Sequence, residues 1–502
     1  MKLISKSIFL DYITCPKDAW FRFNKPELDE FEISETQQNI YNFGNETEVY
    51  AKKLNIFLGA VEIKSKNSEA KNEVDALIAQ KVTAIYQPAF IADRYIIRCD
   101  MLVWNKPSEK WDLYEIKATT SRKDTGERDH ISDVAFQAIV LERYGISVGR
   151  THVVHLNNEY VRAGEIDIEK LFVVSECTTK VEARKLTITD EMEKAKQYLN
   201  QEKEPKDGCE CHFYGRSSHC ATFSLSHPEI PEYSIHDLVY IGKSANKLRK
   251  LVENGIYHLH DIKDTSDFTD AQQNQIETHK TNREIINKEE IENILNGYAY
   301  PLYFFDYETF APAVPVYDGY SPYQRMPIQF SLHIIDKKGG PLRHTDYLHE
   351  ENSDPSGAVA KHLVDNIDPL GTVLAWNVGF ERSVTDELAS RVPEHETSLR
   401  RICGQMQDLM NVFSKQYYVH KDFRGRSAIE SVMNVLLPEM TYDHLPYTGQ
   451  DVGFVWWSDI VNKGEKQSDR ANKIHLIKEY CKQDTLVMVE IFRILNNVIN
   501  KK

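Results

Sequence analysis

Acidic and basic side chains interrupt an otherwise apolar stretch, CDMLVWNKPSEKWDLYEIKAT, residues 99–119. The stretch predicts two strands joined by a turn, and side chains alternate between faces along a strand. Glu115 and Lys117 therefore share a face, with Asp100 beside them on the partner strand. Burying such charges is costly unless they are paired or bind a cation. The residues predict a Mg²⁺ or Mn²⁺ site in which Lys117 orients water or stabilises phosphate charge, the alternative being a Glu–Lys pair on a half-exposed strand.

A second group of acids lies near the other end of the chain. In YFFDYETF, Asp306 and Glu308 stand two residues apart on a predicted strand, so both carboxylates project from one face. In EYCKQDTLVMVEI, Tyr480 and Asp484 lie one helical turn apart. Two acids on one face of a core strand again favour a cation site, whereas a tyrosine and an acid at helical spacing are also typical of a core tyrosine beside a solvated acid.

Eight cysteines occur in the chain. Four of them form a distinct set, with one near the start of the chain and three within one short stretch roughly two hundred residues later. Without a secretory signal, such cysteines are more typical of thiols or metal ligands than of a disulfide framework. Four cysteines can close a structural zinc site or hold an iron–sulfur cluster, or they can be free thiols that happen to cluster. The four candidates are Cys15, Cys209, Cys211 and Cys220. The others lie in apolar contexts that predict core positions: Cys99, Cys177, Cys403 and Cys481.

Length and composition set limits on the class of protein. At 502 residues, with 41% hydrophobic and 27% charged residues, the chain has the composition of a globular protein of about two to four domains. No apolar run approaches the roughly 20 residues of a membrane span. Asp11 interrupts the apolar N-terminal segment and no cleavage site follows, so we expect a cytoplasmic protein. The net charge of −15 argues only weakly against nucleic acid as a partner.

The hydrophobic pattern predicts an α/β protein of two domains with a small helical piece between them. Helices are expected over residues 39–55 and 130–145, and strands over 300–310, 327–336 and 372–381. The stretch KLRKLVENGIYHLHDI predicts a helix, a Gly–Ile turn and a second helix, which would present backbone N–H groups to phosphate or serve as a plain spacer. The expected boundaries are 1–225, 226–297 and 298–502.

An acid on one strand followed by E-I-K on the next resembles the PD-(D/E)xK nuclease superfamily. FGNETEV is similar to a helical motif of its RecB-type branch, and this similarity implies Glu48 as a further metal ligand, with Glu46 as the fallback. FQAIVLERYG is similar to the Gln-and-Tyr helix of the same branch, which implies Gln137 and Tyr144 near the substrate.

One early cysteine followed by three cysteines after the nuclease core resembles the iron–sulfur branch of these enzymes, which includes AddB and the CRISPR-associated RecB-like nucleases. The C-P after a predicted helix and the C-x-F in CHF fit that branch. The resemblance implies a [4Fe–4S] cluster that joins the two ends of the domain, with zinc as the alternative occupant.

The D-x-E of YFFDYETF resembles the first motif of the DnaQ-like, RNase H-fold exonucleases. LAWNVGFERSV resembles their second motif, with Asn377 near the substrate and Glu381 where the family usually has Asp, and Asp408 is an acid in the expected neighbourhood. Y-x-x-x-D resembles the third motif of the tyrosine subtype (DEDDy), which implies that Tyr480 orients the nucleophilic water. The metal ligands implied are Asp306, Glu308, Glu381 and Asp484.

FRGRSAIESVMNVLLPEMTYDHL is similar to the GS-x-S-x-K-x-VLP stretch of a bacterial family of unknown function that fuses both nuclease modules, although Glu430 replaces its lysine. The resemblance covers nearly the whole chain. It implies a metal-dependent nuclease acting on DNA in end processing, repair or defence. The alternatives are an RNA exonuclease, and a DNA-binding scaffold with one inactive nuclease domain. We expect DNA, or alternatively RNA, as the partner and no membrane partner, and the sequence leaves protein partners open.

Overall fold

The structure is a computed structural model that describes residues 2–31, 33, 35–65, 67–80, 82–126, 128–462 and 467–500. The chain divides into two compact units, Met1–Glu229 with Pro312–Gln324, and Ile230–Ala311 with Arg325–Lys502. Both units are mixed α/β, which confirms the expected fold class at that level. The residues expected to form a helical connector belong to the second unit, and a short segment from the C-terminal half belongs to the first.

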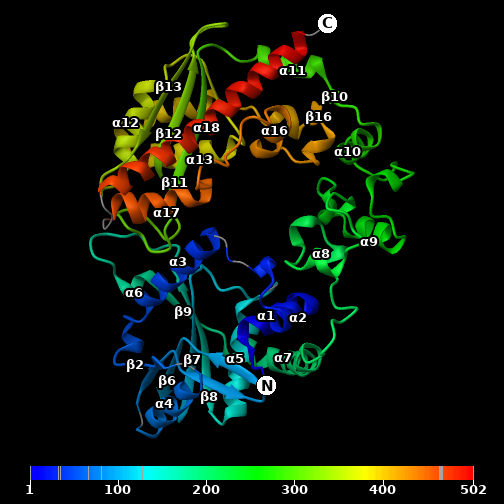
Figure 1. The fold of residues 1–502 in the computed structure, drawn as a ribbon. Coiled ribbons are helices and arrows are strands. Elements are labelled where there is room, and N and C mark those ends of the chain that lie inside the picture. The colour runs from blue at the N-terminus through cyan, green and yellow to red at the C-terminus, as the bar shows by residue number, and fades with distance from the viewer. Residues whose placement is uncertain are drawn as a thin grey trace. The chain divides into compact units, whose positions relative to one another are not determined.

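The first unit is built from nine strands and eight α-helices among its described residues (Figure 1). Its strands are β1 Ile4–Ser5, β2 Val61–Glu62, β3 Ala84–Tyr86, β4 Ala89–Ala92, β5 Tyr95–Arg98, β6 Met101–Asn105, β7 Lys110–Lys117, β8 Val148–Leu156 and β9 Phe172–Glu176. Its helices are α1 Lys6–Thr14, α2 Pro16–Asn24, α3 Glu35–Ala51, α4 Asn67–Ala79, α5 His130–Tyr144, α6 Ile168–Leu171, α7 Thr178–Leu199 and α8 Phe223–Ser226.

The main sheet of the first unit has the order β2-β3-β6-β7-β8-β9. β6 and β7 form the expected antiparallel hairpin, and β7 pairs in parallel with β8. Alternation along β7 divides its side chains between two cores: Leu113 packs with α5 and α7, whereas Tyr114 and Ile116 pack with residues that follow α3. Glu115 is therefore on the α5 face, where it is buried.

The second unit is built around the strands β10 Ile285–Ile286, β11 Leu302–Phe310, β12 Met326–Ile335, β13 Leu342–Leu348, β14 Thr372–Ala375, β15 Met406–Asp408 and β16 Tyr418–Val419. Its helices are α9 Ala245–Glu253, α10 Asp270–Thr281, α11 Lys288–Asn296, α12 Ser356–Asn366, α13 Gly379–Arg391, α14 Glu396–Gln405, α15 Asn411–Ser414, α16 Ile429–Leu436, α17 Gly449–Val455 and α18 Gln467–Asn500.

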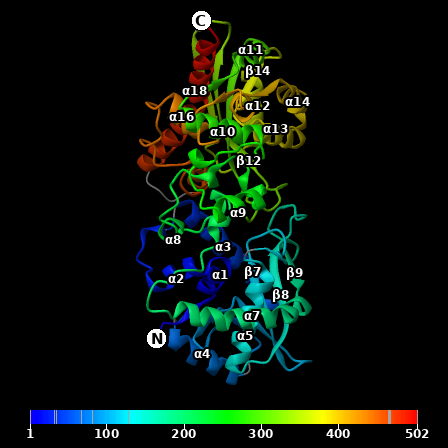
Figure 2. The same cartoon turned by 90° about the vertical axis from the view of Figure 1, so that its right-hand side faces the viewer.

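Five strands of the second unit form a sheet in the order β13-β12-β11-β14-β15. Figure 2 shows α18 on one side of this sheet and α12, α13 and α14 on the other. Leu302 and Phe304 of β11 pack with α18, whereas Tyr303 and Phe305 pack with α12 and α13. Because side chains alternate along a strand, the even-numbered positions of β11, which include Asp306, face α18.

Two local expectations differ from the structure. The strand expected over residues 372–381 ends at Ala375, and α13 begins at Gly379, so Glu381 lies in the first turn of a helix. After the turn at Gly255, the second helix expected in the connector is only a three-residue 3₁₀ turn, Leu259–Asp261. Across the described residues, no helix combines the length and the apolar character needed to cross a membrane.

Candidate active sites and the four-cysteine cluster

The hairpin places Asp100 and Glu115 together in the first unit. Asp100 immediately precedes β6, and its Oδ2 accepts a hydrogen bond of 2.6 Å from the backbone N–H of Ile116. Both carboxyl groups are buried, Glu115 at 2% and Asp100 at 8% exposure. Burial, and then the charge of Glu115, raise the pKa of Asp100 well above its usual range. A bound cation would relieve that cost because it favours the charged form of both carboxylates.

Glu115 is also the centre of a network of hydrogen bonds. Its Oε1 accepts a hydrogen bond from Lys117 Nζ at 2.7 Å, and its Oε2 accepts one from Gln137 Nε2 at 2.7 Å. Asp133, which the sequence analysis did not identify, accepts from Lys117 at 2.6 Å and from Gln137 at 2.9 Å. Asp133 stands four positions before Gln137 on α5, so the helical spacing alone would have placed the two side chains on one face.

A second lysine enters the same network from the N-terminal helix. Lys6 Nζ lies 2.6 Å from Glu115 Oε1 and 3.2 Å from Asp133 Oδ1. Burial alone would lower the pKa of Lys6, but the charges of Glu115 and Asp133 hold it well above its usual range. Burial works against ionisation of Asp133 too, yet Lys117 and then Lys6 hold its pKa well below the usual range. Nothing in the local sequence around Lys6 signals this contact.

Glu48 lies near this group, on α3. Its Oε2 accepts hydrogen bonds from Tyr86 Oη at 2.7 Å and from Gln87 Nε2 at 3.2 Å. The charge of Glu48 contributes to the raised pKa of Asp100. Glu46, the fallback ligand, is half-buried, and burial raises its pKa. The structure thus brings Glu48 into the electrostatic neighbourhood of Asp100.

Tyr144, which the resemblance places near the substrate together with Gln137, does not contact this group of carboxylates. Its hydroxyl donates a hydrogen bond of 2.6 Å to Asp75 on α4, and its ring packs edge-on against Phe90. Seven positions on a helix return to nearly the same face but advance about 10 Å along the axis. That advance separates Tyr144 from the carboxylates around Gln137.

The second group of acids is assembled between β11 and α18. Ligand atoms of Asp306, Glu308 and Cys481 lie within 4.8 Å of one another. Cys481, expected as a plain core residue, is fully buried as predicted, but its thiol lies 3.9 Å from Asp306 Oδ2. Burial raises the pKa of Glu308 well above its usual range, and the charges of Asp306 and Asp484 raise it further.

Asp484 and Tyr480 both come from α18, one turn apart. Burial raises the pKa of Asp484, as does the charge of Asp306. Tyr442, absent from the sequence prediction, donates a hydrogen bond to Asp484 Oδ1, and its ring lies 5.4 Å from that of Tyr480. Burial, and then the charges of Asp484 and Glu308, raise the pKa of Tyr480, so its hydroxyl stays protonated and can donate.

Glu381 lies in the first turn of α13, near the second group of acids. Its side chain is 3% exposed, and its Oε2 is buried with no hydrogen-bond partner among the residues that the structure describes. Burial, and then the charge of Asp408, raise its pKa to about 8, and Glu381 in turn raises the pKa of Asp306. Asn377 lies just before this helix with a left-handed φ of 62°, and its backbone N–H donates to Asp408 Oδ1 at 3.1 Å. The longer Glu side chain therefore still reaches the electrostatic neighbourhood of Asp306.

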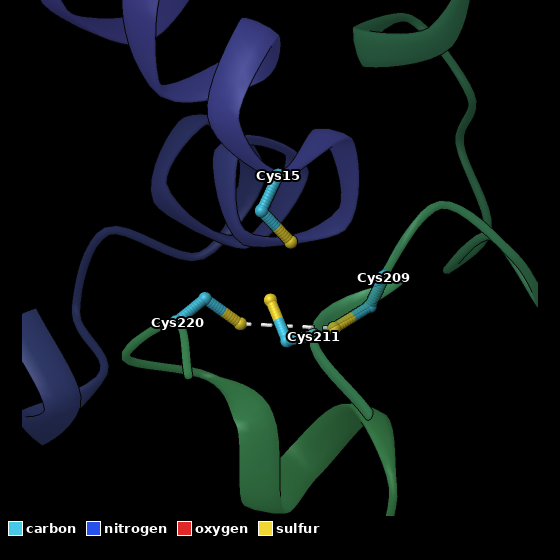
Figure 3. Close-up of side chains that lie close together, drawn as sticks. All are labelled: Cys15, Cys209, Cys211 and Cys220. Atoms are coloured by element: carbon cyan, nitrogen blue, oxygen red, sulfur yellow. Dashed lines mark hydrogen bonds between the residues drawn. The ribbon is translucent and has the colours of Figure 1, made fainter. Parts of the chain in front are cut away.

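The four candidate cysteines converge on one point, as Figure 3 shows. All four Sγ atoms lie within 4.8 Å of one another, and those of Cys209 and Cys220 are 3.7 Å apart. Cys15 comes from the junction of α1 and α2, and the other three come from the segment before α8. Hydrogen bonds among the neighbouring thiols lower the pKa of Cys209 and raise that of Cys15. The structure therefore holds four cysteines at a spacing compatible with a metal ion or cluster.

Protein contacts hold the two parts of this cysteine cluster together. The backbone N–H of Lys17 donates to the carbonyl of Gly208 at 3.0 Å, and Gly208 has a φ of 94°, which favours glycine. Asp18 Oδ1 accepts from the backbone N–H of Thr222 at 3.0 Å and from its hydroxyl at 2.9 Å. His227 Nε2 lies 3.0 Å from the carbonyl oxygen of Cys209. Residues separated by about two hundred positions are thus brought together by protein contacts beside the cysteines.

Comparison with known proteins finds a similarity over part of the chain. Residues 303–428 match a family described as Domain of unknown function (DUF2779). This segment contains Asp306, Glu308, Asn377 and Glu381 and ends before α18. No curated protein matches the chain. A solved structure titled "Crystal structure of SSO0001" aligns at 12% identity over 45% of this chain and 87% of that chain, with a TM-score of 0.20, which supports no statement about fold or function.

Proposed function

We propose that the chain is a metal-dependent nuclease with two phosphodiesterase sites, one in each unit, and that its substrate is DNA. The observation that carries the proposal is the burial of several carboxyl groups at one place in each unit, where burial and mutual repulsion raise pKa values. Proteins keep such groups buried where they bind a cation or perform chemistry. The resemblance to PD-(D/E)xK and DnaQ-like nucleases assigns that chemistry to phosphodiester hydrolysis.

The donor sets fit hard divalent cations such as Mg²⁺ or Mn²⁺, which prefer carboxylate oxygens. In the first unit the ligands would be Asp100, Glu115 and Glu48. In the second they would be Asp306, Glu308, Glu381 and Asp484. Among the residues the structure describes, no lysine or arginine forms an ion pair with Asp306, Glu308 or Asp484, so a cation there would meet no competing basic group. When bound, such ions polarise the phosphate and lower the pKa of water.

At the first site, the chain's own side chains orient the carboxylate of Glu115 and balance its charge. Lys117 is held between Glu115 and Asp133, at 2.7 and 2.6 Å, so its ammonium group is fixed beside the carboxylates rather than mobile. From there it would stabilise negative charge on a phosphate or orient the attacking water. Gln137 fixes the opposite oxygen of Glu115 and so determines the plane of that carboxylate.

At the second site, Tyr480 would position the attacking water through its protonated hydroxyl. Its ring is buried at the same face of α18 as Asp484, and burial keeps the hydroxyl protonated. A protonated hydroxyl can donate to a water or a phosphate oxygen. These features support a 3′-to-5′ exonuclease of the tyrosine subtype.

The four cysteines would hold a [4Fe–4S] cluster, with zinc as the alternative. Cysteine thiolates are the ligands of both groups, and the four sulfurs converge within 4.8 Å of one another. The arrangement of one cysteine from α1–α2 and three from the later segment supports the iron–sulfur proposal by its likeness to the RecB-type branch.

The test is release of nucleotides from end-labelled DNA and RNA by the full chain in Mg²⁺ or Mn²⁺. Glu115→Ala should abolish cleavage by the first site, and Asp306→Ala should abolish cleavage by the second. The double variant should lose both activities. The matched controls are Glu109→Ala, an exposed acid in the β6–β7 turn, and Asp336→Ala, an acid just beyond β12. Cleavage that survives in the double variant would rule out both sites, and cleavage of RNA alone would replace DNA as the substrate.

A further inference from the structure

Lys6 and Lys117 bridge the same pair of acids. Lys117 Nζ contacts Glu115 and Asp133 at 2.7 and 2.6 Å, and Lys6 Nζ contacts them at 2.6 and 3.2 Å. The two lysines are far apart in the sequence: Lys117 is the last residue of β7, and Lys6 is the first residue of α1. The predicted E-I-K motif accounts for one of these lysines and leaves the other unexplained.

The contacts of Lys6 determine which oxygen of Glu115 remains free. A carboxylate offers about four acceptor positions, two on each oxygen. On Glu115, Oε1 accepts from both lysines and Oε2 accepts from Gln137. Among the contacts of the described residues, the open position is therefore on Oε2. Without Lys6, Oε1 would also have an open position, so a cation could meet either oxygen.

Lys6 is also connected to the cysteine cluster by a single helix. α1 begins at Lys6 and ends at Thr14, and Cys15 is its C-terminal cap. Along the helix, Phe9 stacks on Phe136 at 4.5 Å, and Asp11 forms an ion pair with Arg128. Nine residues span about 14 Å, so the helix carries Lys6 at one end and a cluster ligand at the other.

We propose that Lys6 is a positioning residue of the first carboxylate site, and that the metal ion or cluster held by the four cysteines sets the position of Lys6 through α1. The inference rests on the proposed function for the role of Lys6, whereas the connection through α1 does not depend on it. A bound group fixes Cys15, Cys15 fixes the end of α1, and the helix holds the ammonium group within hydrogen-bond distance of Glu115.

The connection is tested first by the reactivity of lysine side chains, which requires no activity. Reductive methylation of the full chain is followed by mass spectrometry, before and after anaerobic removal of the cysteine-bound metal with a chelator. The Lys6 side chain is 26% exposed and doubly paired, so methylation should be slow in the loaded protein and about tenfold faster after removal. Lys185, bonded to Glu142 and Glu182, should keep its rate. An unchanged rate at Lys6 overturns the connection.

If the methylation rate rises at both Lys6 and Lys185, removal of the metal has unfolded the protein generally. A second pair of variants then tests the connection through α1. Ile13→Gly loosens α1 between Lys6 and Cys15 without removing any cysteine, and Ile13→Ala is its matched control because Ala favours the helix. Ile13 is 39% exposed, so neither change opens a core cavity. Methylation of Lys6 about threefold faster in the Gly variant supports the connection, and equal rates in the two variants overturn it.

The positioning role is tested by kinetics in an Asp306→Ala background, where only the first site acts. Lys6→Met should lower kcat about tenfold with KM for DNA within twofold, and Lys6→Arg should restore part of the loss, because an arginine can bridge the same two acids. Lys110→Met, an exposed lysine on β7, is the matched control. If Lys6→Met cleaves like its parent, the positioning role fails. If Glu115→Ala also cleaves like its parent, the proposed function fails instead.

Discussion

Tyr442 donates a hydrogen bond to Oδ1 of Asp484, the acid that α18 contributes to the second site. Tyr442 lies between α16 and α17, 42 positions before Asp484. Burial and the charge of Asp306 make Asp484 reluctant to ionise, and the hydrogen bond from Tyr442 acts in the opposite direction. The hydroxyl therefore favours the charged form of the carboxylate, which is the form that binds a cation.

Replacing Tyr442 by Phe should weaken metal binding at the second site. Without the donated hydrogen bond the pKa of Asp484 rises further, so protons compete better with Mg²⁺. A hydrogen bond to a charged group is worth about 1.5–3 kcal/mol, and we expect the Mg²⁺ concentration for half-maximal rate to rise about tenfold, measured in a Glu115→Ala background. Tyr417→Phe, outside the site, is the control. An equal Mg²⁺ dependence in the Tyr442→Phe variant would contradict this role.

Gln137 and Tyr144 lie on one helix but should differ in function. Gln137→Leu removes the donor to Glu115 Oε2 and to Asp133, so cleavage by the first site should fall at least tenfold. Tyr144→Phe removes only the hydrogen bond to Asp75 and should leave cleavage within twofold. The measurement is kcat in the Asp306→Ala background. A larger loss for Tyr144→Phe than for Gln137→Leu would reverse this assignment.

Local periodicity predicts the parts of the sites that lie on single elements. The period of two along β7 brings Glu115 and Lys117 together, and the period of two along β11 aligns Asp306 with Glu308. The helical period places Tyr480 and Asp484 on one face of α18. These relationships depend only on neighbours in sequence, which is why they could be read before the structure was known.

Contacts between residues far apart in the sequence could not be predicted from local periodicity. Lys6 is 109 positions from Glu115, and no local pattern marks it as part of the site. Cys481 sits in an apolar helix face, which predicts its burial but not its position beside Asp306. Tyr144 shows the converse limit, because two side chains on one helix face can have different neighbours when two turns intervene. Tertiary packing of α1 and α18 against the sheets decides these positions.

We expect the group bound by the four cysteines to colour the protein and to stabilise the first unit. Two cysteine variants test both effects. Cys220→Ser should lose the bound metal and, since metal binding is coupled to folding, lower the melting temperature of the first unit. Cys403→Ser, a half-buried cysteine of α14, should retain both. Anaerobic purification, a visible spectrum, and iron, sulfide and zinc analyses are the measurements. One zinc and no visible band would keep the site but replace the iron–sulfur cluster, and no metal in the parent protein would contradict the assignment.

His333 should make the stability of the second unit depend on pH. Its ring is 3% exposed, and its Nδ1 lies 2.8 Å from the hydroxyl of Thr485 on α18. Burial, and then the charge of His344, lower the pKa of His333 to about 3. An unfolded histidine titrates near about 6.5. Below that pH the unfolded chain binds a proton that the folded unit excludes, so stability falls as the pH is lowered from about 6.5 toward 3.

The contribution of this group is isolated by His333→Asn, which removes the titration. Between pH 6 and pH 4.5 the parent protein should lose stability more steeply than the variant, by an amount approaching about 1.4 kcal/mol per pH unit. Urea unfolding of the second unit at several pH values measures both slopes. His395→Asn, at the less buried turn before α14, is the control and should follow the parent. Parallel slopes for parent and His333→Asn would mean that His333 takes up its proton equally in the folded and unfolded states.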